Sequence, residues 1–414
     1  MTPLDPEAIN QAAAVLNGVV KRTSLERNVR LSEIHSKDVF LKREDAQLCR
    51  SYKVRGAYNL IHSLSDDQRQ QGVVCASAGN HAQGVAFACR ELGIQGRIFL
   101  PTNTPQQKRQ RIETIGGDWI EIVFAGNSYD EASARALNDS RATEAVYVHP
   151  FNDLRTIAGQ GTVAHEFVQQ FDGDFGTVVV PVGGGGLISG IATWLRSCRP
   201  DVRIVGAEPE GAASMSAAIR DGRPVDIGPV DTFVDGAAVG CVGSITFPIV
   251  RDLVDEIITV PEGAVCTEML DMYQADGIIA EPAGALASAA IQFLPISNSD
   301  PIICVVSGGN NDVSRYTDVL ERSLLYLGLR HYFLVSFAQQ PGSLRGFLDD
   351  VLIDGEDIVV FEYVKKTNRD TGPALVGIDL QRESNLPALL SRMEKSPLQI
   401  ERVLPGSPLF TFLH

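Results

Sequence analysis

Positive charge is scarce in this sequence of 414 residues. It contains 36 lysines and arginines against 51 aspartates and glutamates, so the formal net charge is −15. A net anion is repelled by nucleic acids and by anionic membranes, so a small molecule is the better partner. No stretch approaches the roughly 20 apolar residues of a membrane span, and residues 1–6 lack the basic and apolar regions of a signal peptide. We therefore expect a cytoplasmic protein that binds neither nucleic acid nor membrane.

Cysteine is also sparse. The seven cysteines are an odd number and show no C-x-x-C spacing, so we interpret them as reduced thiols and predict no metal site. The length suggests two or three domains. With 44% hydrophobic and 21% charged residues, the composition is that of an ordinary globular chain and not of a disordered one. We find no internal repeat and no low-complexity tract.

Short β-rich runs alternate with helical patterns between about residues 39 and 306. The runs lack clean polar and apolar alternation, which is typical of parallel strands buried on both faces. They predict an α/β fold, and the clearest of them are residues 39–41, 72–76, 96–100, 177–180, 203–207 and 302–306. Several lead directly into glycine-containing turns, at the strand ends where open α/β sheets hold their ligands.

The pattern changes past about Gly328. Strands are predicted at residues 331–337, 357–363, 374–380 and 398–403, and helices from residue 342 and over residues 386–393. This βαββαβ order predicts a ferredoxin-like α+β domain. Residues 317–327 have helical periodicity and are interpreted as a linker.

Three glycine-containing turns and one lysine stand out. Lys53 opens a helical pattern, and a lone lysine there is usually a solvated surface residue. Residues 77–84 follow a strand, and the plain interpretation is a tight turn with an asparagine cap. Four consecutive glycines, from residue 183, cost conformational entropy that a simple loop has no reason to lose. A further turn follows at residues 307–312.

The four consecutive glycines favour a phosphate cradle made of backbone N–H groups, over a flexible turn or a dinucleotide fingerprint. We call residues 183–187 the glycine nest; its members are Gly183, Gly184, Gly185, Gly186 and Leu187. Combined with a lysine, such turns suit a ligand with a phosphate, a ring and an aldehyde. Pyridoxal 5′-phosphate fits that description.

The chain resembles the threonine dehydratases (threonine ammonia-lyases), of the fold-type II pyridoxal-phosphate family. The matching segments span nearly the whole chain and are residues 41–45, 51–58, 77–84, 158–162, 183–187, 280–286 and 307–310. Residues 322–325, 331–333 and 340–345 are similar to the shorter biosynthetic branch, which has one ACT-like domain. The resemblance implies a tryptophan-synthase-β-like catalytic region of two parallel-sheet subdomains over residues 1–325. The smaller subdomain would occupy residues 50–150, and the ACT-like domain residues 328–408.

The resemblance also implies a role for individual residues. Lys53 would form the Schiff base with the cofactor, Asn80 would hydrogen-bond its phenolic oxygen, and Ser307 would face its pyridine nitrogen. The glycine nest would hold the phosphate. The substrate carboxylate would lie on the loop made of Ser77, Ala78, Gly79, Asn80 and His81. Glu281 and Gly236 lie in stretches that line the site, with roles left open.

The implied reaction is β-elimination of L-threonine to 2-oxobutanoate and ammonia, the first step of isoleucine biosynthesis. Lys53 would be the base, and L-serine would give pyruvate. A serine racemase is the nearest rival, but Ala78 offers no hydroxyl for reprotonation. Ser214 stands where the racemase cation site, near Glu208, would need a carboxylate. More distant alternatives are a catalytically degenerate amino-acid sensor and a nicotinamide dehydrogenase.

The ACT-like segment has two interpretations. In the regulatory one it binds a branched-chain amino acid, isoleucine or valine, and biases the catalytic state. In the other it serves only for dimerisation. A homodimer or homotetramer is expected.

Overall fold

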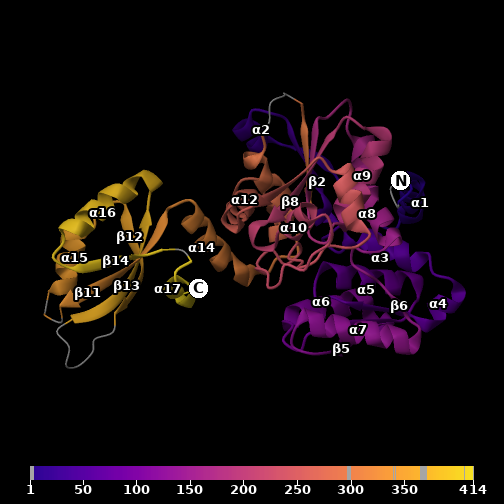
Figure 1. Ribbon diagram of the computed structural model, residues 1–414, viewed down its shortest axis with the longest axis horizontal. Helices are drawn as coiled ribbons and strands as arrows, with labels where there is room; N and C mark the ends of the chain where they lie inside the picture. Colours follow the sequence, from indigo (N-terminus) through magenta and orange to yellow (C-terminus); the bar gives the residue numbers. More distant parts are fainter. Residues whose placement is uncertain are drawn as a thin grey trace. The chain divides into compact units, whose positions relative to one another are not determined.

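The computed structural model describes residues 4–295, 300–338, 340, 342–363, 371–404 and 406–413. The chain forms two compact units, Met1–Val313 and Ser314–His414 (Figure 1). The predicted boundary at residues 325–328 lies near the end of helix α14 (Tyr316–Tyr326), which belongs to the second unit. In the part of the chain that the structure describes, no helix is both long and apolar enough to cross a membrane.

A six-stranded sheet forms the centre of the larger part of the first unit. Its strand order is β1-β2-β10-β7-β8-β9, and only the β1–β2 pair is antiparallel. The strands are β1 (Leu25–Asn28), β2 (Val39–Arg43), β7 (Thr177–Pro181), β8 (Arg203–Pro209), β9 (Glu256–Val260) and β10 (Ile302–Val306). Every residue of β7 and β10 is buried, as the sequence predicted for strands covered on both faces.

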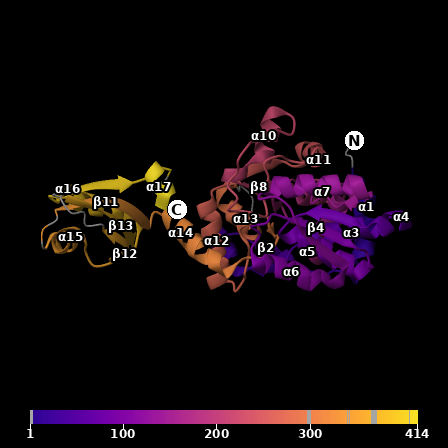
Figure 2. The same cartoon turned by 90° about the horizontal axis from the view of Figure 1, so that it is seen from below.

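A four-stranded parallel sheet, of order β5-β4-β3-β6, forms the smaller part. Its strands are β3 (Val73–Ala76), β4 (Gly96–Leu100), β5 (Ile120–Phe124) and β6 (Val146–Tyr147). Figure 2 shows α7 (Tyr129–Thr143) on one side of β4, with α5 (Asn80–Leu92) and α6 (Gln106–Gly116) on the other. The α/β prediction is confirmed.

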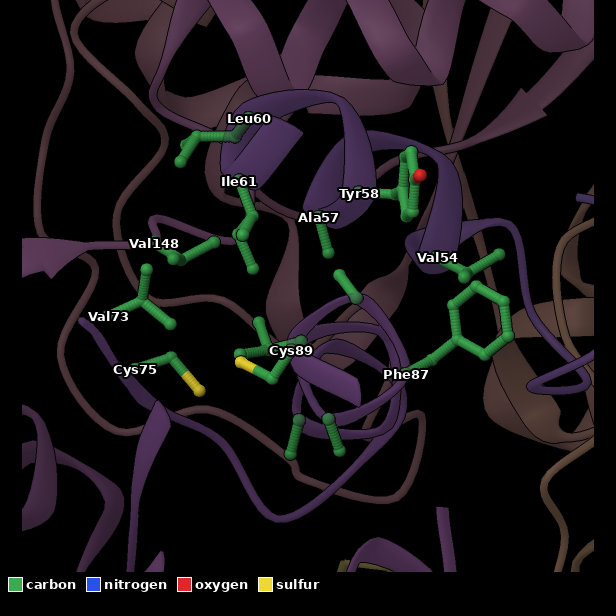
Figure 3. Close-up of a cluster of buried hydrophobic side chains, with 14 of the residues drawn as sticks. Val54, Ala57, Tyr58, Leu60, Ile61, Val73, Cys75, Phe87, Cys89 and Val148 are labelled. Carbon is green, nitrogen blue, oxygen red and sulfur yellow. The ribbon is translucent and has the colours of Figure 1, made fainter. Parts of the chain in front are cut away.

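Helix α3 (Lys53–His62) joins the two sheet systems, because it packs on α5 and on α8 (Leu154–Gln170). Two glycines allow this close approach: a Cβ at Gly84 would lie 3.0 Å from the Cα of Val54, and one at Gly159 would lie 2.6 Å from the carbonyl oxygen of Arg55. The apolar face of α3 enters a buried cluster in which Ile61 points toward Cys89 of α5 (Figure 3). The first turn of α3 is therefore held from both sides.

Other helices cover the large sheet. Helix α13 packs on β7, β8 and β10, while α9 packs on β7 and on α8. The helices of the first unit not yet given are α1 (Pro6–Leu16), α2 (Val29–His35), α4 (Asp66–Gln71), α9 (Gly186–Cys198), α10 (Ser214–Asp221), α11 (Thr246–Leu253), α12 (Glu262–Gln274) and α13 (Pro282–Ala289).

The second unit confirms the predicted βαββαβ order. After α14 come β11 (Arg330–Ala338), α15 (Ser343–Val351), β12 (Glu356–Tyr363), β13 (Thr371–Leu380), α16 (Leu386–Lys395), β14 (Gln399–Val403) and α17 (Pro408–Leu413). The sheet order β12-β13-β11-β14 is ferredoxin-like and antiparallel. Phe333, Val335 and Phe337 form one core with Phe347 of α15 and Leu389 of α16. This unit therefore has a hydrophobic core of its own.

Candidate active site

A cavity of about 1060 Å³ opens where the strand ends of both sheets meet. Lys53, the 77–81 loop and the whole glycine nest line it. A small adjoining hollow shares Lys53, Asn80 and Gly183 with the cavity and reaches Ser307. The structure thus brings together residues that the sequence analysis took from four separate segments.

Lys53 is the first residue of α3, and backbone hydrogen bonds tie its approach to the turn after β10. The N–H of Tyr52 donates to the carbonyl of Ser307 at 3.2 Å, and the N–H of Gly309 donates to the carbonyl of Arg50 at 2.9 Å. Among the described residues, no carboxylate lies within ion-pair distance of the Lys53 amine, although its charge acts on Glu281; its Nζ lies 5.4 Å from the centre of the Tyr52 ring. An amine that no ion pair holds is sterically free to react with an aldehyde through its unprotonated form.

The glycine nest joins β7 to α9. Gly185 has a φ of +90°, in the left-handed region that glycine adopts without strain. No acceptor in the described ranges receives the N–H of Gly183, Gly184 or Gly185, and the first N–H groups of α9 have no partner within the helix. This is the arrangement that binds a phosphate without a basic side chain.

Phe151 lies directly against the glycine nest and was missed by the sequence analysis. A Cβ at Gly184 would fall 2.4 Å from the Phe151 ring, and one at Gly186 would fall 2.9 Å from its Cβ. Thr246, also missed, donates from Oγ1 to the carbonyl of Gly184 at 2.6 Å. The four consecutive glycines predicted a phosphate cradle, but no local pattern indicated Phe151 or Thr246 beside it.

The 77–81 loop connects β3 to α5. The N–H of Gly79 donates to Ser77 Oγ at 3.2 Å, and the space where a Gly79 side chain would stand is open. The ring of His81 is buried, and its Nε2 lies 2.7 Å from the carbonyl oxygen of Val148. Burial lowers the pKa of His81 to about 3. Its imidazole is therefore neutral and does not supply a positive charge to a bound carboxylate.

Glu281 is buried beside Asn80 at the N-terminal end of α13. Asn80 Nδ2 donates to Glu281 Oε1 at 2.6 Å, and the N–H of Asn310 donates to Glu281 Oε2 at 3.2 Å. Burial, followed by the charge of Asp235, raises the pKa of Glu281 to about 7 despite these hydrogen bonds. Gly236 packs against the first turn of α13, because a Cβ at Gly236 would lie 2.7 Å from the Cβ of Ala283.

Ser307 is buried directly after β10. Its Oγ donates to the carbonyl of Ala283 at 3.0 Å. With the hydrogen so placed, the oxygen offers lone pairs to the hollow, and rotation of the hydroxyl would make it a donor instead. A neutral group of this kind can meet a ring nitrogen in either protonation state.

Glu208 does not point into a metal cluster. Its buried carboxylate accepts from the N–H of Met215 at 2.6 Å and from the N–H and Oγ of Ser216 at 2.9 and 2.8 Å, so it caps α10. Burial raises the pKa of this carboxyl. Over the described ranges, no group of three or more His, Cys, Asp or Glu residues is placed to hold a metal ion.

A buried ion network lies behind Lys53. Arg55, fully buried, makes paired hydrogen bonds to Glu44 (2.8 and 2.8 Å) and to Glu166 (2.6 and 2.9 Å). Lys42 adds an ion pair to Glu166 at 2.7 Å. Burial alone would raise the pKa of Glu44, but the charge and hydrogen bonds of Arg55, together with Lys42 and Thr23, outweigh it, and the pKa lies below its ordinary value. The network fixes α3 to β2 and α8.

Two family models match the chain. The model described as pyridoxal-phosphate dependent enzyme matches residues 16–308, and the model described as C-terminal regulatory domain of threonine dehydratase matches residues 321–413. The first match lies within the catalytic region expected from the sequence, and the second begins at residue 321, seven residues before the expected ACT-like domain.

Similar proteins cover the chain almost from end to end. The biosynthetic L-threonine dehydratase IlvA of Mycobacterium tuberculosis is 53% identical over 407 residues, which are 98% of this chain and 95% of that protein. IlvA of Bacillus subtilis is 46% identical, over 95% of this chain and 94% of that protein. Among solved structures, the processed form of threonine deaminase isoform 2 from Solanum lycopersicum has a TM-score of 0.73 at 38% identity, over 78% of this chain and 90% of that one. Maize serine racemase has a TM-score of 0.72 at 34% identity, over 78% and 98%.

Proposed function

Because the chain belongs to the biosynthetic L-threonine dehydratase family of pyridoxal-phosphate-dependent enzymes, we propose that it converts L-threonine into 2-oxobutanoate and ammonia in isoleucine biosynthesis. The observation that carries the proposal is the convergence on one cavity of the Lys53 amine and a nest of backbone N–H groups that have no acceptor among the described residues. These residues fit pyridoxal phosphate, since they match both its aldehyde and its phosphate.

Residues of the cavity and of the adjoining hollow could hold each end of the cofactor. Lys53 Nζ would hold the aldehyde carbon, the glycine nest the phosphate, Asn80 the phenolic oxygen and Ser307 the ring nitrogen. When bound, the cofactor supplies an electron-withdrawing ring that stabilises negative charge on the substrate α-carbon.

The protein contributes the base and the orientation of the substrate. The amine of Lys53, which lines the cavity, would take the α-proton of the amino acid in its unprotonated form. The 77–81 loop would hold the substrate carboxylate through backbone donors, since His81 is neutral. Bound in this way, the substrate would keep its α-hydrogen close to Lys53, and the β-hydroxyl would leave with a proton as water. The released enamine would tautomerise and be hydrolysed by water to 2-oxobutanoate and ammonia.

L-Serine would also react, to give pyruvate. It differs from threonine by one methyl group, and a hydrophobic contact with one such group discriminates only about 10- to 200-fold. Ala78 borders the cavity and has no hydroxyl, which favours elimination over racemisation.

We infer that the second unit is regulatory and that isoleucine or valine is its effector. The match of the regulatory-domain model to residues 321–413 supports a regulatory role, and the separate core of this unit would let it respond as one body. A homodimer or homotetramer is the proposed assembly. Velocity against threonine concentration, with and without each effector, tests the regulation: curves that superimpose would refute it. Light scattering measures the assembly.

The reaction is tested by mixing the purified protein with L-threonine, L-serine and their D-enantiomers and measuring keto acid. The wild-type protein should act on the L-forms, and borohydride should leave a pyridoxyl group on Lys53, detectable by mass spectrometry. Lys53→Ala should lose both signals. Lys37→Ala, outside the cavity, is the matched control and should keep them. Keto acid formed by Lys53→Ala at the wild-type rate would refute the mechanism.

A further inference from the structure

The side-chain amide of Asn80 can face a ligand in two ways. One orientation presents an N–H donor, and the other presents a carbonyl acceptor. Asn80 lines both the cavity and the small hollow that reaches Ser307. The proposed function places this amide against the cofactor's phenolic oxygen, where only a donor stabilises negative charge. The inference below rests on that site.

Asn310 determines which atom of Asn80 is the oxygen. Asn310 Nδ2 lies 2.8 Å from the carbonyl oxygen of Cys49, and a carbonyl can only accept, so this atom of Asn310 must be the nitrogen. The same Nδ2 lies 2.6 Å from one amide atom of Asn80. Asn310 Nδ2 also lies 3.2 Å from Gln83 Oε1, so it shares two hydrogens among three neighbours, of which the Asn80 atom is the nearest. A nitrogen of Asn80 at that position would bring N–H groups against each other, so the atom accepts and is Oδ1.

Glu281 fixes the other end of the amide. Its Oε2 receives the backbone N–H of Asn310 at 3.2 Å, and its Oε1 lies 2.6 Å from Asn80 Nδ2. In the ionised form, which prevails above the Glu281 pKa of about 7, the carboxylate pairs with an amide N–H and repels an amide oxygen. In the flipped orientation, Asn80 would place nitrogen against nitrogen at Asn310 and oxygen against oxygen at Glu281. Both neighbours therefore select the same orientation.

The backbone of the turn after β10 places both partners. The N–H of Glu281 donates to the carbonyl of Gly308 at 3.1 Å. A Cβ at Gly308 would lie 2.4 Å from Glu281 Oε1 and 3.2 Å from Asn80 Nδ2, so the pair fits only beside a glycine. Asn310 follows two residues later, on the same turn. The contacts are thus built into the turn.

We propose that Asn310 and Glu281 are positioning residues that lock the amide of Asn80, so that its second Nδ2 hydrogen, which Glu281 does not use, faces the phenolic oxygen of the cofactor. Neither residue needs to touch the cofactor for this. Loss of the lock lets the amide present its oxygen, which repels the phenolate.

The deciding variant is Asn310→Asp, which keeps the side-chain shape but replaces the donor by acceptors. The introduced carboxylate would attract Asn80 Nδ2 and turn the amide oxygen of Asn80 toward the cofactor. In apoprotein titrated with pyridoxal phosphate, the dissociation constant should rise roughly tenfold or more, as expected for one lost charged hydrogen bond. The pH midpoint of the absorption change of the bound cofactor should rise as well, because the anionic phenolate is less stabilised.

Two further variants keep the test decisive. Asn310→Ala removes the donor without adding charge and should shift both readouts in the same direction, by less. Glu281→Gln leaves a single side-chain oxygen to accept from both Asn80 Nδ2 and the N–H of Asn310. It should also weaken the binding of pyridoxal phosphate. Asn59→Asp is the matched control: Asn59 Nδ2 donates to the carbonyl of Arg155 at 2.8 Å, away from this network, so this variant should keep the wild-type absorption midpoint.

A wild-type dissociation constant and midpoint in Asn310→Ala would overturn the inference, even if Asn310→Asp fails to fold. Both readouts are taken without substrate. Inactivity of the wild-type protein on threonine would therefore overturn the proposed reaction alone. Unchanged binding in the Asn310 variants would overturn this inference alone.

Discussion

Removing the buried guanidinium of Arg55 should strongly destabilise the first unit. Arg55 and Glu44 are fully buried, and the network of Lys42, Glu44, Arg55 and Glu166 holds two positive and two negative charges. Arg55→Met leaves one carboxylate without compensation. Breaking a buried pair in this way costs about 3–5 kcal/mol, because the remaining charge stays out of water.

Removing one carboxylate as well, so that the buried network is again neutral, should restore much of the lost free energy of unfolding. In the double variant Arg55→Met with Glu44→Gln, Lys42 still pairs with Glu166 at 2.7 Å, and no charge is left over. We expect the free energy of unfolding to recover by at least about 1.5 kcal/mol relative to the single variant. The control is Arg27→Met, because Arg27 and Asp38 form an exposed pair at 2.7 Å that should contribute at most about 1 kcal/mol.

The assay can be confined to the catalytic unit. The sequence has two tryptophans, Trp119 and Trp194, and both lie in the first unit, so tryptophan fluorescence during urea unfolding reports this unit. Apoprotein is used, since bound cofactor would add its own stabilisation. A loss below about 1 kcal/mol for Arg55→Met, or a double variant no more stable than the single one, would refute the reasoning.

Three other perturbations have definite expected outcomes. Gly184→Ala should weaken pyridoxal phosphate binding more than tenfold, because its Cβ would fall 2.4 Å from the Phe151 ring; added Phe151→Leu should recover part of the affinity in the same titration. Burial lowers the pKa of His81 to about 3, so its contribution to stability is complete above the unfolded value of about 6.5 and is lost as the pH falls toward 3. From pH 7.5 to 5 it should cost about 2 kcal/mol in urea unfolding, and His81→Gln should flatten that slope. Lys108 and Asp235 both line the cavity and form an exposed ion pair at 3.2 Å. Lys108→Met should therefore change KM for threonine by less than about fivefold. Salt screens an exposed pair, so a KM difference between variant and wild type that persists at about 1 M salt would contradict this interpretation.

Local patterns predicted the buried strands well but not the edge of the sheet. β7 and β10 consist largely of valine and isoleucine, because strands covered on both faces need apolar side chains throughout. β1, by contrast, reads Leu-Glu-Arg-Asn and is formed through its pairing with β2. Its position outside the predicted α/β stretch reflects tertiary pairing that a single sequence window does not contain.

The candidate site, too, could be predicted only in part from the sequence. The glycine nest could be recognised in the sequence as four consecutive glycines after a strand, and the structure places it on the cavity beside Lys53. The roles of single residues came from family resemblance, since a lysine or a glycine turn alone has ordinary structural explanations. Phe151 and the cap formed by Glu208 depend on contacts with residues distant along the chain, and no local pattern encodes them.

The position of β10 has a consequence for how the protein is made. In the large sheet β10 lies between β2 and β7, yet it is synthesised about 260 residues after β2, on the order of tens of seconds later at ribosomal speed. The small sheet can form earlier, because its strands are nearly contiguous along the chain. Until β10 emerges, β2 and β7 carry unpaired edges that invite aggregation, and the lysine and the glycine nest belong to separate halves. A nascent chain therefore has no cofactor site before its catalytic region is almost complete, and free pyridoxal phosphate cannot assist the earlier steps of its folding.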